Sequence, residues 1–158
     1  MQASPVKLLL CVVDELEGCI YACGGCRENF VSAALSMMDP RTWAWSSLPT
    51  MPATTGAAMT LSRMYVPGGR SPPRDVASLH CYDLDAGRWD TCCAPMSVIR
   101  LGHGVAALQG EVWALGGQAG IFTALASVEV YSPRLNSWRA GEALPHSWYD
   151  GACSMVQC

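Results

Sequence analysis

Nine cysteines in 158 residues are the groups in this sequence with the most chemistry available to them. Cys23 and Cys26 have the two-residue spacing of a zinc-binding pair, and Cys19 lies just upstream. A structural zinc ion takes four ligands, usually from two such pairs, and the sequence holds no second pair. Cys19 and Cys23 also alternate with Tyr21, as residues packed on one face of a strand do. We therefore expect no zinc site, and no other cofactor.

Cys26 is the cysteine whose sequence neighbours favour a reactive thiol. Arg27 follows it directly in an expected loop, and a neighbouring cation stabilises a thiolate. Glu28 offsets part of this effect, and an ordinary loop cysteine is the alternative. We expect Cys26 to be alkylated faster than Cys19 or Cys153.

The remaining polar residues lack the spacing of a catalytic site. The three histidines, His80, His103 and His146, fall in different parts of the chain and form no metal-binding pattern. The sequence has no nucleophile elbow and no phosphate-binding loop. Asp83 and Asp85 flank an expected turn, where acids are ordinarily solvated. We expect a protein that is not an enzyme.

Composition and charge exclude several further classes. Hydrophobic residues make up 51% of the chain and charged residues 15%, which favours an ordered, buried chain. The net charge of −3 provides no basic surface for nucleic acid. The apolar run at 8–13 is too short for a signal peptide core or a membrane span. With an odd number of cysteines, we expect reduced thiols and a cytoplasmic location.

The elements that must position these residues are clearest at 100–138. Apolar runs at 105–108 and 112–115 flank Gln109-Gly110, the pattern of two antiparallel strands joined by a two-residue turn. A third run ends at Tyr131, and a turn then leads to Trp138. This unit therefore predicts four short strands.

The same marks recur in phase along the chain, which indicates an internal repeat. The diglycines are 44 and then 48 residues apart, and the tryptophans 44 and then 49. Met38, Tyr82 and Tyr131 each precede a tryptophan by seven residues. The repeat positions are Gly24, Gly25, Trp45, Gly68, Gly69, Tyr82, Trp89, Gly116, Gly117, Tyr131 and Trp138.

This set of diglycine, tyrosine and tryptophan at a period near 50 resembles the kelch repeat, over about residues 6–156. The segments MDPRTWAW, YDLDAGRW and YSPRLNSW look most like those of the kelch-like adaptor proteins. The resemblance implies an all-β fold, a kelch-type β-propeller built from four-stranded blades. We expect a partial propeller over 1–158, with blades at about 6–47, 56–92 and 103–140 and an extra strand at 151–156.

Two features depart from a complete, regular propeller. Pro67 stands where the next unit has Leu115, and a proline removes a ladder donor, so we expect the second strand of that blade to stop early or to be irregular. Kelch propellers usually have about six blades. We therefore expect a piece of a longer chain or a shortened isoform, whose uncovered blade faces would favour self-association or aggregation.

In propellers of this kind, the loops between second and third strands gather with the interblade linkers and bind partners. Here those loops are 26–32, 70–78 and 118–126. Arginines and aromatic residues dominate protein interfaces, and arginines fork onto carboxylates. Solvated loop charges are the alternative interpretation. The candidate partner-binding residues are Arg27, Arg70, Arg74, Arg100, Trp148 and Tyr149.

The resemblance implies a protein-binding module, like the substrate-recognition propeller of a cullin-RING ubiquitin-ligase adaptor. The BTB and BACK domains that would contact the ligase are absent from this sequence, so the chain alone would hold a substrate without recruiting the enzyme. One alternative is a kelch scaffold associated with cytoskeletal proteins and without a ubiquitin link. A less favoured alternative is an enzyme like the copper-dependent galactose oxidase.

Overall fold

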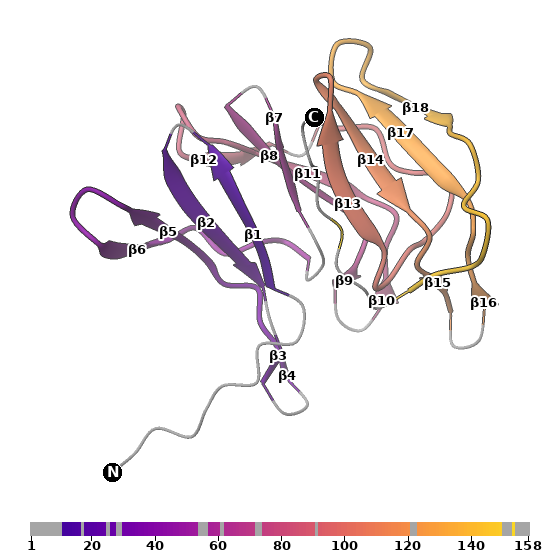
Figure 1. Ribbon diagram of the computed structural model, residues 1–158, viewed down its shortest axis with the longest axis horizontal. Coiled ribbons are helices and arrows are strands. Elements are labelled where there is room, and N and C mark those ends of the chain that lie inside the picture. The colour runs from indigo at the N-terminus through magenta and orange to yellow at the C-terminus, as the bar shows by residue number, and fades with distance from the viewer. Residues whose placement is uncertain are drawn as a thin grey trace.

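The computed structural model describes residues 11–16, 18–24, 26–27, 30–53, 57–60, 62–71, 74–90, 92–120, 123–149 and 153. Every helix or strand within these ranges is a β-strand (Figure 1). The predicted strand at 151–156, the predicted first residues of the chain and Gly25 lie outside them.

Three four-stranded antiparallel sheets follow one another along the chain, and each connects its strands in sequence order (Figure 1). The first contains β1 (Cys11–Leu16), β2 (Cys19–Gly24), β5 (Leu35–Asp39) and β6 (Ala44–Leu48). The second contains β7 (Ala58–Thr60), β8 (Arg63–Pro67), β11 (Leu79–Asp83) and β12 (Arg88–Asp90). The third contains β13 (Gly104–Leu108), β14 (Glu111–Leu115), β17 (Val128–Ser132) and β18 (Ser137–Ala140). The predicted all-β fold class is confirmed, and we call the three sheets blades 1, 2 and 3.

The sequence predicts plain loops after the second strand of each blade, but the structure differs there. Each one contains a short antiparallel pair of two-residue strands. The pairs are β3 (Cys26–Arg27) with β4 (Phe30–Val31), β9 (Arg70–Ser71) with β10 (Arg74–Asp75), and β15 (Gln118–Ala119) with β16 (Thr123–Ala124). All three lie toward one end of the blades, at the lower side of Figure 1. The fourth strand of a blade returns to this end, so the interblade linkers begin here too; we call it the loop end.

The expectation that Pro67 would end its strand early is wrong. β8 runs through Pro67, which pairs with Leu79 of β11 and is fully buried. On the other side, the described pairing of β7 stops at Ala58, opposite Tyr65, two residues short of the proline. A proline is tolerated at the end of a strand where no carbonyl of a neighbouring strand requires its N–H as a hydrogen-bond donor.

The blades pack face to face, with their first strands side by side. β1 lies beside β7, and β7 lies beside β13, while β6 and β18 lie at the two outer sides of the view (Figure 1). One core cluster joins blades 1 and 2 around Met64 and Val66. A second joins blades 2 and 3 around Cys81, Val112 and Tyr131. Each described blade therefore buries its apolar side chains against its neighbour, as propeller blades do.

The repeat tryptophans occupy equivalent positions in the three blades. Cross-strand pairing joins Met38 to Trp45, Tyr82 to Trp89 and Tyr131 to Trp138. In the second and third pairs the ring centroids lie 5.1 and 5.2 Å apart. The seven-residue spacing thus places an aromatic pair across the last two strands, within the 4.5–7 Å range typical of aromatic pairs.

Candidate functional site

The β9–β10 pair carries two of the predicted partner-binding arginines into solvent at the loop end. The Arg70 side chain is 49% exposed, and its Nε donates to Asp75 Oδ1 at 2.9 Å. Arg74 is exposed, and among the residues that the structure describes it has no ion-pair partner. A guanidinium without a partner keeps its donors available for a carboxylate on another molecule.

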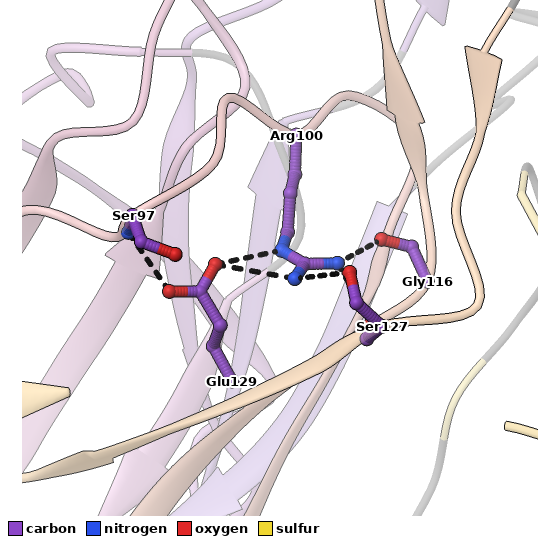
Figure 2. A network of polar contacts seen from close by, with 5 residues as sticks. All are labelled: Ser97, Arg100, Gly116, Ser127 and Glu129. Carbon is purple, nitrogen blue, oxygen red and sulfur yellow. Dashed lines mark hydrogen bonds and ion pairs between the residues drawn. The ribbon is translucent and has the colours of Figure 1, made fainter. Parts of the chain in front are cut away.

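Arg100, the third predicted partner-binding arginine, is a correction. Its side chain is 0% exposed, so it cannot meet a partner at the surface. Nε and Nη2 donate to Glu129 Oε1 at 3.2 and 3.1 Å, and Nη1 donates to the carbonyl oxygen of Gly116 (Figure 2). Nη1 also donates to the carbonyl oxygen of Ser127. Arg100 therefore fastens the linker between blades 2 and 3 to blade 3.

The carboxylate of Glu129 completes this buried network. Its second oxygen accepts a hydrogen bond from the backbone N–H of Ser97 at 2.8 Å, and Arg100 Nη2 also donates to Ser127 Oγ at 2.9 Å (Figure 2). Glu129 is not among the site residues predicted from the sequence. The signal was present, because a glutamate between Val128 and Val130 puts a charge inside an otherwise apolar strand, and a buried charge requires a partner.

Trp148 and Tyr149, the predicted aromatic binders, have different environments. Trp148 is half-buried, and its backbone is tied to the loop end: its N–H donates to Leu125 O, and its carbonyl accepts from Gly117 N at 2.7 Å. Tyr149 is 50% exposed. Trp148 thus helps to hold the linker, whereas Tyr149 offers a ring to solvent. The side chain of Arg27 lies outside the part of the chain that the structure describes.

Backbone hydrogen bonds hold the linkers at the same positions in successive blades. Met51, Met96 and Leu144 each donate their N–H, at 2.8 Å, to a carbonyl of the preceding blade. Four residues further on, the carbonyl of Arg100 accepts from Gly69, as that of Trp148 does from Gly117. These repeated bonds give the loop end a fixed framework on which the exposed side chains stand.

Two glycines of the diglycine pairs, Gly68 and Gly117, have positive φ angles and also lie too close to the following linker to carry a Cβ. Gly68 has a φ of +64°, and a Cβ there would lie 2.9 Å from the carbonyl oxygen of Arg100. Gly117 has a φ of +92°, and a Cβ there would lie 2.6 Å from that of His103. Any larger residue would separate the linker from the blade.

His103 fills the space between these two glycines and is 5% exposed. Neither ring nitrogen has a hydrogen-bond partner among the described residues. Burial, reinforced by the Arg100 cation, lowers the pKa of His103 to about 3. The imidazole is therefore neutral and acts as a packing group between blades 2 and 3.

The described residues include no group of three or more His, Cys, Asp or Glu side chains placed to hold a metal ion. None of the described residues belongs to a helix with the length and apolarity needed to span a membrane.

Comparison with known proteins identifies the repeats. A family model described as the Kelch motif matches residues 9–52 and 99–145, which correspond to blades 1 and 3. Blade 2 lies between these matches and has the same strand connections.

Similar curated proteins carry the same motif in their names. Human Kelch-like protein 33 is 34% identical over 74% of this chain and 23% of its own length. Bovine Kelch-like protein 36 is 29% identical over 84% of this chain and 23% of its own length. Human Kelch repeat and BTB domain-containing protein 13 is 32% identical over 72% of this chain and 26% of its own length. The chain spans about a quarter of the length of these relatives. Its repeats, register and relatives together show that the chain belongs to the kelch-like family.

Proposed function

We propose that this chain is the substrate-recognition part of a cullin-RING ubiquitin-ligase adaptor that acts in the cytoplasm. The kelch repeats and the kelch-like relatives support a protein-interaction propeller domain. The adaptor role is supported by the similarity to a relative whose name joins kelch repeats with a BTB domain. The partners proposed are proteins, with no role for nucleic acid or membrane.

Blades 1, 2 and 3 are proposed to be consecutive blades of one propeller, at about 6–47, 56–92 and 103–140. Further blades would cover the outer faces of blades 1 and 3. Where those faces stay uncovered, self-association is the expected result, because a bare apolar face of several hundred Å² forfeits roughly 10 kcal/mol of burial.

The exposed arginines of the β9–β10 pair carry the proposal that the loop end binds the partner. Arg70 and Arg74 stand on the second blade, between the linkers that precede and follow it. Ile99, which is 44% exposed, adds apolar surface on the linker that follows blade 2, and Tyr149 adds it on the linker that follows blade 3. A cationic group beside exposed apolar side chains suits a partner segment that combines carboxylates with a hydrophobic residue.

The test is a charge reversal in the protein tagged at its natural locus. Arg74→Glu is expected to lose co-purified partners, whereas Arg41→Glu is the matched control, since Arg41 is 86% exposed on the β5–β6 turn, away from the loop end. Both variants are expected to keep a co-purified cullin. Retention of partners by Arg74→Glu would contradict the binding surface, and loss of the cullin from all samples would contradict the adaptor role and favour a scaffold.

A further inference from the structure

The β9–β10 pair of blade 2 places a serine opposite one of its two exposed arginines. Cross-strand pairing joins Ser71 to Arg74 and Arg70 to Asp75. Residues that face each other across two antiparallel strands lie on the same side of the pair, and successive residues alternate between its two sides. Ser71 and Arg74 therefore share one side, whereas Arg70 and Asp75 share the other.

The two sides of the pair differ in charge. Arg70 Nε donates to Asp75 Oδ1 at 2.9 Å, so this cation and this anion neutralise each other. Arg74 is exposed, and the described residues include no ion-pair partner for it. Ser71, its cross-strand neighbour, is half-buried and uncharged. Because the Cβ atoms of such neighbours lie about 4.5–5.5 Å apart, an anion attached to Ser71 Oγ would lie within reach of the Arg74 guanidinium.

Ser71 also has the sequence neighbour that one class of kinase requires. Ser4, Ser71 and Ser132 are each followed by proline, and proline-directed protein kinases phosphorylate serine in this position. A residue before proline favours extended backbone, which is the form in which a kinase binds a substrate segment. Ser4 lies outside the described residues, which leaves Ser71 and Ser132 to compare.

Ser71 and Ser132 belong to sheets of different stability. β9 and β10 form a separate two-stranded sheet, whereas Ser132 ends β17 within the four strands of blade 3 and pairs with Ser137 of β18. An isolated two-stranded pair is marginally stable, so it opens more readily than a strand within a blade. A kinase must draw its substrate segment out of the sheet. The fold therefore favours Ser71, and only Ser71 of the two has an arginine as its cross-strand neighbour.

We propose that Ser71 is a phosphorylation site for a proline-directed protein kinase, and that its phosphate pairs with Arg74 and withdraws this arginine from partner binding. In the transfer, Ser71 Oγ attacks the γ-phosphorus of ATP, a new P–O bond forms, and the bond to the β,γ-bridging oxygen breaks. ADP leaves, and the hydroxyl proton passes to the catalytic aspartate of the kinase. The regulatory role rests on the proposed function, in which Arg74 binds carboxylates of the partner.

Phosphorylation reverses the charge on this side of the pair. A phosphate carries a charge of about −1.5 to −2 at pH 7, which exceeds the single positive charge of Arg74. A partner segment that carries carboxylates then meets a net negative charge in place of a guanidinium with open donors. The phosphorylated form is therefore expected to release an acidic partner.

The first test follows the modification itself. The intact protein is incubated with a proline-directed kinase and ATP, and residue-resolved mass spectrometry measures phosphate at each serine over time. We expect Ser71 to be modified at least about tenfold faster than Ser132, because the β9–β10 pair opens more readily. The proposal is overturned if Ser71 is modified no faster than Ser132.

The second test measures the pairing with Arg74, in protein with phosphoserine incorporated at position 71 during translation. Phosphorus NMR gives the pH midpoint at which the phosphate takes its second charge, ordinarily about 6. Arg74→Gln should raise this midpoint by roughly 0.2–0.7 of a pH unit, the effect of one exposed ion pair. Arg41→Gln, which removes an 86%-exposed arginine elsewhere, should leave it unchanged. An equal midpoint with and without Arg74 overturns the pairing.

The third test separates the regulation from the proposed function. In the protein tagged at its natural locus, Ser71→Glu should lose the same co-purified partners as Arg74→Glu, and Ser71→Ala should keep them. Partners lost from Arg74→Glu but kept by Ser71→Glu overturn the regulation and leave the binding surface in place. Partners kept by both variants contradict the binding surface and the regulation together, while the midpoint still decides the phosphate pairing.

Discussion

Blades 1 and 3 have the same strand order and the same cross-strand tryptophan, yet the two tryptophans differ in environment. In blade 3, Trp138 is half-buried, and its indole N–H donates to the carbonyl of Ala94 at 2.8 Å. Trp89 of blade 2 makes the matching bond to Pro49 at 3.2 Å. Trp45 of blade 1 is 57% exposed. The repeat tryptophan therefore stabilises the contact between its blade and the linker that precedes that blade, more than it stabilises the blade itself.

The largest loss of stability should come from breaking the buried ion pair between Arg100 and Glu129, which fastens a linker to blade 3. Arg100→Met leaves the Glu129 carboxylate buried without its cation, which costs about 3–5 kcal/mol of the free energy of unfolding. Urea unfolding monitored by circular dichroism measures this cost.

Two controls sharpen that result. Arg139→Met removes a 55%-exposed partner of Glu111 from the same blade, and a pair this open should contribute about 0–1 kcal/mol. The double variant Arg100→Met/Glu129→Leu should lose less than Arg100→Met alone, because no unpaired charge remains. Equal losses for Arg100→Met and Arg139→Met would mean that the buried network does not fasten the linker.

The tryptophans themselves provide the second test. Trp138→Ala removes a half-buried ring and the hydrogen bond to Ala94, with an expected loss of about 2–3 kcal/mol. Trp45→Ala removes a mostly exposed ring and should lose less than about 1 kcal/mol in the chain of 158 residues. Thermal unfolding of both variants compares them directly, and similar losses would show that the tryptophan stabilises its own blade.

The spacing of seven residues was sufficient to predict the register of these tryptophans, since a short turn between two strands fixes which residues face each other. The spacing could not predict their burial, which depends on a linker some 40 residues earlier in the chain. Nor could it assign Arg100, whose acidic partner is 29 residues away and on another element. The two-residue strands such as β9 and β10 are too short to show apolar alternation.

The third test uses pH to separate the junction of blades 2 and 3 from the rest of the chain. Because the folded-state pKa of His103 is about 3 and the unfolded value is about 6.5, only the unfolded state gains a proton between these values. The contribution of His103 is complete above pH 6.5 and is lost as pH falls, by about 2 kcal/mol at pH 5.

Urea unfolding between pH 7.5 and pH 5 measures this slope, and the window stays above the range in which the aspartates titrate. Burial lowers the pKa of His80 too, so its contribution has the same sign. His103→Gln should flatten the slope, and exposed His146→Gln should leave it unchanged. A wild-type slope that persists in His103→Gln would assign the pH dependence to His80 or to another group.

The smallest effect concerns the turn that precedes each repeat tryptophan, where the blades differ in residue type but share one backbone conformation. Trp43, Gly87 and Asn136 stand two residues before Trp45, Trp89 and Trp138, and their φ angles are 55°, 64° and 47°. Glycine and asparagine adopt this left-handed conformation readily, whereas other L-residues lose about 1–2 kcal/mol. Trp43 is 77% exposed, so it gains little burial in return.

Trp43→Gly should therefore stabilise the chain by about 0.5–1 kcal/mol. This is the backbone strain relieved in the folded state minus the entropy cost of ordering glycine, which has more freedom than tryptophan in the unfolded state. Gly87→Ala is the reciprocal change. Its new Cβ would meet nothing closer than Tyr82 Oη at 4.0 Å, so its loss of about 1 kcal/mol isolates the conformational cost. Thermal unfolding of the two variants should shift in opposite directions. If Trp43→Gly instead destabilises the chain, the Trp43 ring makes stabilising contacts that outweigh its backbone strain, and the prediction is wrong.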